Sequence, residues 1–126
     1  MLILDSGGVT RLAERSWRAA DLIAALRREA QWPPVVPSPV LIECLRGDPA
    51  RDAAVNRLLK TCQVLEDITE SLARRAAHLR ARARAGSAVD ALVVAVAEPG
   101  GRVLTSDPTD LSALANHADD VLVERA

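Results

Sequence analysis

Four acidic residues occupy positions where a carboxylate could do chemistry. Asp5 and Asp107 each follow a short apolar run of the kind that forms a β-strand. Asp90 falls in the first turn of an expected helix, and Glu43 lies inside the apolar segment VLIECL. Carboxylates that converge repel one another and raise one another's pKa, so a cluster of them favours a bound divalent cation. A ligand set made only of oxygen atoms indicates Mg²⁺ or Mn²⁺ rather than zinc or copper.

Each of these acids also has a purely structural interpretation. Ser87 and Asp90 have the spacing of a capping box at a helix start. Asp107 precedes a proline, as a helix N-cap often does, and Asp5 could cap the turn after the first strand. Glu43 could lie on the exposed face of its helix. Independent caps need not meet at one edge of a sheet, so convergence of the four would favour the chemical interpretation.

The elements that must position these acids alternate along the chain as short β-like runs and helical runs. Strands are expected at 2–4, 35–36, 64–65, 102–105 and 121–123, and helices at 10–30, 38–47, 48–62, 71–85, 87–98 and after 107. Without a tight hairpin signal, this alternation predicts an α/β fold of three layers, with a parallel sheet of about five strands between helices. Parallel strands end at one edge, where Asp5 and Asp107 would meet.

Composition bounds the possible functions. With 126 residues the chain has room for one domain, residues 1–126, and its 16 Lys+Arg and 17 Asp+Glu give a net charge of −1. That balance excludes a nucleic-acid binder that works by bulk charge, and the absence of Phe and Tyr excludes recognition by base stacking. The longest apolar run, 91–97, is too short to span a membrane, and the N-terminus lacks the basic region of a signal peptide. A cytoplasmic protein is therefore expected.

Local basic patches remain. The segment 73–85 carries arginines and no acid, and the candidates for contact with RNA or with a partner are Arg75, Arg80, Arg82 and Arg84. The same segment is equally consistent with a solvated basic helix. The arginines within 11–18 form a second cluster with the same two interpretations.

Four segments, LILDSGG, VLIECLRG, GSAVDALVVAVA and RVLTSDPTDL, stand in this order. Together they resemble a PIN domain, of the small bacterial kind that serves as the VapC-like ribonuclease toxin of toxin–antitoxin pairs. The resemblance covers essentially the whole chain and implies a three-layer fold around a five-stranded parallel sheet. Its four acids fall on Asp5, Glu43, Asp90 and Asp107, with Asp110 as a candidate auxiliary acid.

The resemblance further implies metal-dependent hydrolysis of RNA phosphodiester bonds. Asp5, Asp90 and Asp107 would hold Mg²⁺ or Mn²⁺, and Glu43 would orient a metal-bound water. Ser6 matches the small hydroxyl residue that follows the first acid, and residues 105–106 match a hydroxyl beside the fourth. A cognate antitoxin protein and a homodimer are the partners that the family implies.

Three other hypotheses stay open. A PIN-like fold could serve as a binding or regulatory module without cleavage activity, or as a nuclease for other structured nucleic acids. A phospho-receiver domain has a similar length and acids at its strand ends, but it needs a lysine at the end of the last strand. Lys60, the only lysine, lies in an expected helix well before that strand, so the receiver hypothesis is weak.

Overall fold

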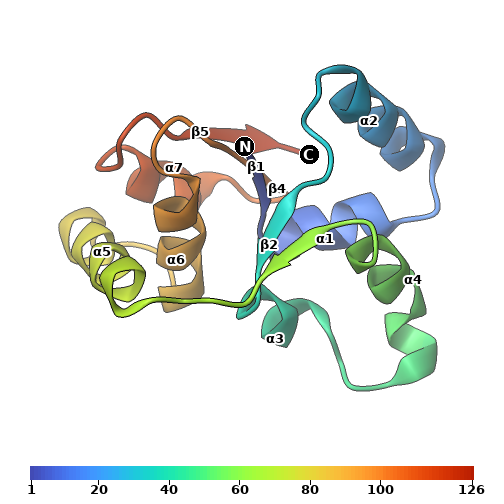
Figure 1. The fold of residues 1–126 in the computed structure, drawn as a ribbon, viewed down its shortest axis with the longest axis horizontal. Helices are drawn as coiled ribbons and strands as arrows, with labels where there is room; N and C mark the ends of the chain where they lie inside the picture. The colour runs from blue at the N-terminus through green and yellow to red at the C-terminus, as the bar shows by residue number, and fades with distance from the viewer.

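The computed structural model describes residues 1–126, and a single twisted sheet runs through the middle of the molecule (Figure 1). Its strands are β1 (Leu2–Leu4), β2 (Val35–Pro37), β3 (Gln63–Leu65), β4 (Arg102–Thr105) and β5 (Leu122–Arg125). They lie in the order β3-β2-β1-β4-β5, and every neighbouring pair is parallel. The predicted parallel sheet of five strands is therefore confirmed.

Helices cover both faces of this sheet, as the alternation of elements predicted. They are α1 (Ser6–Ala13), α2 (Trp17–Arg28), α3 (Val40–Cys44), α4 (Pro49–Leu59), α5 (Glu70–Ala83), α6 (Ala88–Ala97) and α7 (Thr109–Ala115). In Figure 1 the helices α1 to α4 lie on one side of the sheet and α5 to α7 on the other. None of the helices combines the length and the apolar character that a membrane crossing requires.

The core is aliphatic and centres on β1 and α6. Ile3 and Leu4 of β1 are fully buried, because β1 is the middle strand and both of its faces are covered. All seven residues from Ala91 to Ala97 are buried as well. A helix that is apolar on every side needs a neighbour on every side, and α6 has the sheet on one side and α5 on the other.

The expected helix 10–30 is wrong as a single element, because the structure divides this region into α1 and α2. Helix α1 begins at Ser6 rather than at residue 10, since Asp5 is its N-cap. Glu14 then leaves the helix with an extended backbone, and the Ser16 hydroxyl accepts a hydrogen bond from the Ala19 N–H at 3.1 Å. This cap satisfies a backbone donor at the start of a new helix, which apolar periodicity alone does not reveal.

The expected helix 38–47 is also shorter than predicted. Ser38 does not cap it, because the Ser38 N–H donates to the Leu65 carbonyl oxygen at 2.9 Å and so still belongs to the sheet. Only Val40–Cys44 is helical, without a side-chain cap. The helix that follows begins as predicted, with the Asp48 carboxylate accepting from the Ala50 N–H at 3.0 Å.

Smaller differences concern the ends of two other elements. Helix α5 ends at Ala83 with Arg84 in a left-handed conformation (φ 53°), so Gly86 is not the residue that stops it. The last strand is Leu122–Arg125 rather than 121–123. Neither difference moves a candidate site residue.

Substitution of Ile3 tests whether β1 lies at the centre of the hydrophobic core. Ile3→Ala is expected to lower the free energy of unfolding by about 2–5 kcal/mol, because it leaves a cavity in a fully buried position. Ile42→Ala is the matched control, since Ile42 is 82% exposed, and it should change stability by less than about 0.5 kcal/mol. Urea unfolding followed by circular dichroism measures both, and equal stabilities of the two variants would contradict this view of the core.

Candidate active site

The parallel topology brings the four acids to one edge of the sheet. Asp5 follows β1, Asp107 follows β4, and Glu43 lies in the short helix after β2. Asp90 lies in the first turn of α6, which runs back from the carboxyl edge of the sheet to the edge where β4 begins. The convergence that the sequence could only suggest is thus a consequence of the chain direction.

Asp5 is the most buried of these acids, with 8% of its surface exposed. One carboxylate oxygen accepts from the Gly8 N–H at 2.7 Å and the other from the Thr105 hydroxyl at 2.6 Å. Burial raises the pKa of Asp5, while these two hydrogen bonds oppose the rise and the negative charge of Asp90 adds to it. A side chain at Gly8 would collide with the Leu104 carbonyl oxygen, so glycine lets the first turn of α1 lie against β4.

Asp90 has the structural role considered for it and also lies close to two other acids. Its carboxylate accepts from the Ser87 N–H at 3.0 Å, and its own N–H donates to the Ser87 hydroxyl at 3.0 Å, which forms a complete capping box. Only one carboxylate oxygen is used in this way. The negative charge of Asp90 still raises the pKa of Asp5 and of Glu43, so the cap faces the acidic edge.

Glu43 completes a set of three carboxylates that influence one another. Partial desolvation raises the pKa of Glu43, and the charges of Asp90 and Asp5 raise it further. The neighbouring Ser6 hydroxyl lowers it, which places Ser6 beside Glu43 at this edge. Glu43 is exposed as a residue, so its carboxylate lies at the rim of the site while Asp5 lies at its base.

Asp107 is exposed, and it is not the helix N-cap that the sequence suggested, because Pro108 occupies that position. Its side chain accepts a hydrogen bond from the Thr109 N–H at 3.3 Å in the turn before α7. Its backbone N–H donates to the Thr105 hydroxyl at 3.1 Å, so Thr105 connects the Asp107 backbone to the Asp5 carboxylate. Asp110 is an exposed acid in the first turn of α7 and has no contact with the other acids.

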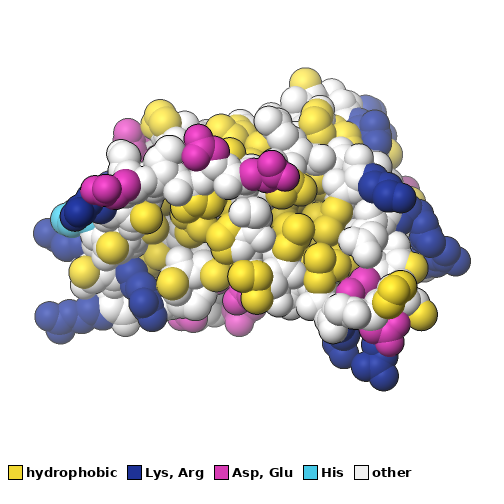
Figure 2. Space-filling view, turned by 60° about the horizontal axis from the view of Figure 1, so that its bottom comes forward, with side chains coloured by type: hydrophobic (Ala, Val, Ile, Leu, Met, Phe, Trp, Pro, Cys, Tyr) yellow, Lys and Arg dark blue, Asp and Glu magenta, His cyan; other side chains and the backbone are white.

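The candidate arginines in and just after α5 differ in whether their guanidinium groups have partners within the protein. Arg75 forms a two-pronged ion pair with Glu98, with nitrogen–oxygen distances of 2.8 and 2.7 Å, so it joins α5 to the end of α6. Arg80 donates to the Gly86 carbonyl oxygen at 3.2 Å. Arg82 and Arg84 are exposed. Figure 2 shows that Lys and Arg side chains gather at the two ends of the molecule, with hydrophobic side chains exposed between them.

The ligand atoms available at this edge are of the kind that a hard divalent cation prefers. Asp5, Glu43 and Asp90 supply only carboxylate oxygens, and a cation would relieve the mutual repulsion that raises the pKa of Asp5 and Glu43. No three acidic, histidine or cysteine side chains lie close enough together to enclose an ion by themselves. A cation here would therefore complete its coordination with water, as Mg²⁺ usually does in proteins.

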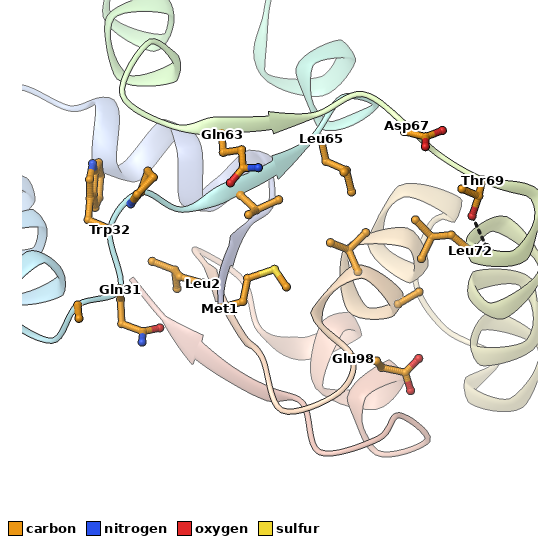
Figure 3. Close-up of a pocket in the computed structure, with 15 residues that line it drawn as sticks. Met1, Leu2, Gln31, Trp32, Gln63, Leu65, Asp67, Thr69, Leu72 and Glu98 are labelled. Carbon is orange, nitrogen blue, oxygen red and sulfur yellow. Dashed lines mark hydrogen bonds between the residues drawn. The ribbon is translucent and has the colours of Figure 1, made fainter.

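The largest cleft of the molecule, about 660 Å³, lies away from this edge (Figure 3). Its lining includes Met1 and Gln63, at the beginnings of β1 and β3, together with Trp32, Leu72 and Glu98. None of the four acids lines it.

Comparison with known proteins supports the fold. No protein-family model matches the chain, and no curated protein matches it. Among solved structures, a chain of FitAB bound to an IR36 DNA fragment is 17% identical, with a TM-score of 0.67 over 99% of this chain and 94% of that one. A chain of FitAcB from Neisseria gonorrhoeae is also 17% identical, with a TM-score of 0.64 over 98% and 96%. The chain thus has a PIN-like fold, and the resemblance of the motifs is confirmed at that level.

One buried acid escaped the sequence analysis. Asp52 is 5% exposed, yet it lies in an exposed-looking stretch of α4, and its partners are the backbone N–H groups of Arg46 and Gly47. Backbone partners leave no mark in the residue types, so only the spacing Gly47-Asp48-Pro49 could have indicated a constrained turn here.

Thr105→Val tests the support of Asp5. The substitution keeps the side-chain shape but removes the hydroxyl, so the pKa of Asp5 should rise further above its usual range. A raised pKa makes the folded state bind more protons than the unfolded state, so the free energy of unfolding should fall more steeply as pH rises above 3.8. Carbon-13 NMR titration of the Asp5 carboxyl measures the pKa directly. Thr10→Val, on the exposed side of α1, should leave it unchanged.

Proposed function

We propose that this protein is a Mg²⁺- or Mn²⁺-dependent endoribonuclease, the VapC-like toxin of a toxin–antitoxin pair. One observation carries the proposal: Asp5, Glu43 and Asp90 converge at the carboxyl edge of a PIN-like fold, close enough for the charge of Asp90 to raise the pKa of both other carboxyls. Acids that serve only as helix caps need not lie close enough together to shift one another's pKa.

Each acid has a distinct part in the proposed reaction. Asp5 and Asp90 would hold the cation. The Thr105 hydroxyl donates to the Asp5 carboxylate, and the Ser87 N–H donates to the Asp90 carboxylate. Glu43, with its raised pKa at the rim, orients the attacking water and is suited to accept its proton. Asp107 would add its carboxylate to the cation site from the outer side. The chemistry that a bound divalent cation supplies is activation of water and stabilisation of the departing oxygen, which leaves 5′-phosphate and 3′-hydroxyl ends.

A protein partner is part of the proposal. The similarity to a chain of the FitAB complex supports a cognate antitoxin, and the family resemblance also implies a homodimer. A partner seated at this edge would cover Ile42, which lies next to Glu43 and is 82% exposed. Such a cover would block access of RNA to the site.

The first test is cleavage of RNA by single-site variants. Asp5→Asn and Asp90→Asn should each lower the rate of Mg²⁺- or Mn²⁺-dependent cleavage by at least about 100-fold, because each removes a ligand charge. Asparagine can still accept the cap hydrogen bonds from Gly8 and Ser87, so the fold should persist by circular dichroism. Asp21→Asn, on the exposed surface of α2, is the matched control.

Undiminished cleavage in both site variants would contradict the assignment of the site. Cleavage of structured DNA in preference to RNA would favour the broader nuclease hypothesis. Absence of cleavage with either metal would favour a binding module without catalytic activity.

The toxin role has its own test. Expression of the unsubstituted chain in a bacterial host should arrest growth, and co-expression of the product of a small neighbouring gene should restore it. Asp90→Asn should express at a similar level without arresting growth, since the toxicity requires cleavage. Equal growth inhibition by both chains would contradict a toxin that acts through this site.

A further inference from the structure

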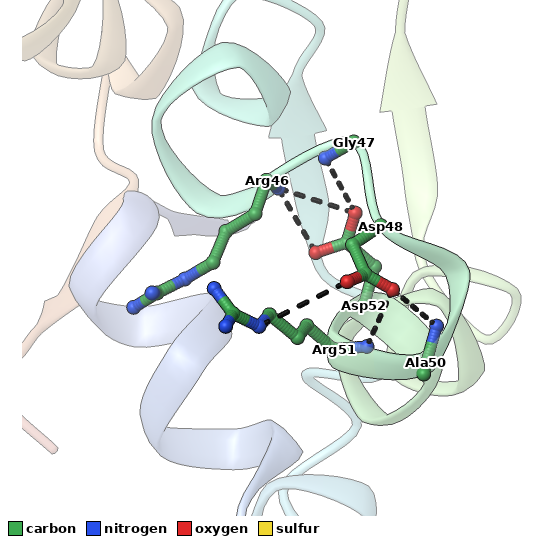
Figure 4. Close-up of polar contacts among 6 residues, drawn as sticks. All are labelled: Arg46, Gly47, Asp48, Ala50, Arg51 and Asp52. Atoms are coloured by element: carbon green, nitrogen blue, oxygen red, sulfur yellow. Dashed lines mark hydrogen bonds and ion pairs between the residues drawn. The ribbon is translucent and has the colours of Figure 1, made fainter.

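The carboxylate of Asp52 fixes the turn between α3 and α4. It accepts from two backbone N–H groups: the Arg46 N–H is shared between both carboxylate oxygens, at 2.9 and 3.1 Å, and the Gly47 N–H donates at 2.9 Å (Figure 4). Hydrogen bonds to an ionised carboxylate are about twice as strong as those between neutral groups. Asp52 is only 5% exposed and is bound only to backbone groups. Its role is therefore to hold this turn in place.

The turn needs such a support, because α3 is only five residues long and has no side-chain cap. Its last residues lead directly into Arg46, three positions after Glu43. The Arg46 guanidinium is exposed and has no ion-pair or hydrogen-bond partner in the structure. Figure 4 shows the Arg46 and Arg51 side chains extending from the turn to the same side of it, and Arg51 lies 3.9 Å from Asp48.

These two arginines belong to the same edge of the sheet as the acids. Helix α4 connects the parallel strands β2 and β3, so its first turn must lie at the carboxyl edge, as the first turns of α1 and α6 do. Asp48 caps α4 at this edge, and Asp5 caps α1 there. The fixed turn therefore holds the backbone of Arg46 three residues after Glu43.

We propose that Arg46 binds a backbone phosphate of the RNA next to the acidic site and that Asp52 is the positioning residue that holds Arg46 there. The inference rests on the proposed function. A cluster of carboxylates repels a polyanion, so a nearby cation must hold the RNA, and the planar guanidinium matches phosphate with two parallel hydrogen bonds. Arg51 is a weaker contact, because Asp48 partly neutralises it.

Binding of a short labelled single-stranded RNA tests the phosphate contact without any cleavage. The dissociation constant is measured in EDTA between about 50 and 200 mM salt, where each phosphate contact on a single strand contributes about 0.7 to the slope of log affinity against log salt. Arg46→Ala should weaken binding and reduce the slope by about 0.7. Arg28→Ala is the matched control, because Arg28 is an exposed arginine at the end of α2 and should leave the slope unchanged.

A double-mutant cycle tests the positioning role. Asp52→Asn keeps the size of the side chain but turns a donor toward the backbone N–H groups, so it should reduce the slope as Arg46→Ala does. The double variant should show no further reduction, since both changes remove one contact. If Asp52 acts only on stability, Asp52→Asn would lower the unfolding temperature and leave the slope intact, which would contradict the positioning role.

The outcomes separate this inference from the proposed function. Absence of RNA binding by the unsubstituted chain would contradict the proposed function itself. RNA binding whose salt slope is the same in Arg46→Ala would contradict only the phosphate contact. Arg46 is exposed, so its substitution leaves the fold intact and keeps this test decisive even if Asp52→Asn does not fold.

Discussion

The shared direction of the five strands is the constraint on which the rest of this molecule depends. Each connection between parallel strands must start at the carboxyl edge and return to the other, so Asp5 at the start of α1 and Asp90 in the first turn of α6 lie at the same edge. Helix starts attract acidic N-cap residues and acids in their first turns, because these satisfy free N–H groups. Topology thereby concentrates carboxylates at one edge before any chemistry is considered.

The cost of this arrangement is electrostatic. Burial and neighbouring charge raise the pKa of Asp5, and partial desolvation with two neighbouring acids raises that of Glu43. Asp5 and Asp90 each use a carboxylate oxygen for a cap and keep a negative charge at this edge. The structural role of these two residues therefore does not exclude a chemical one.

The net charge of −1 is the sum of acidic and basic residues that gather in different regions of the molecule. Asp5, Glu43 and Asp90 lie close together, while many Lys and Arg side chains gather at the two ends of the molecule (Figure 2). Not every arginine is available to a substrate: Arg75 is occupied by Glu98, and Arg80 donates to a backbone carbonyl. Which arginines are free to bind a ligand depends on such partners, and on the turns that fix the arginines, rather than on the number of basic residues in a segment.

The sequence alone determined the alternation of strands and helices and the parallel sheet, because apolar runs, Pro and Ser signals and chain alternation are local features. It misplaced the break between α1 and α2 and the start of α3, where Ser38 still bonds to β3. Only the tertiary structure showed that Asp5, Glu43 and Asp90 lie close together and that the Asp52 carboxylate holds the backbone of Arg46. The physical reason is that these relations depend on hydrogen bonds to distant backbone and on burial, which residue types and spacing do not encode.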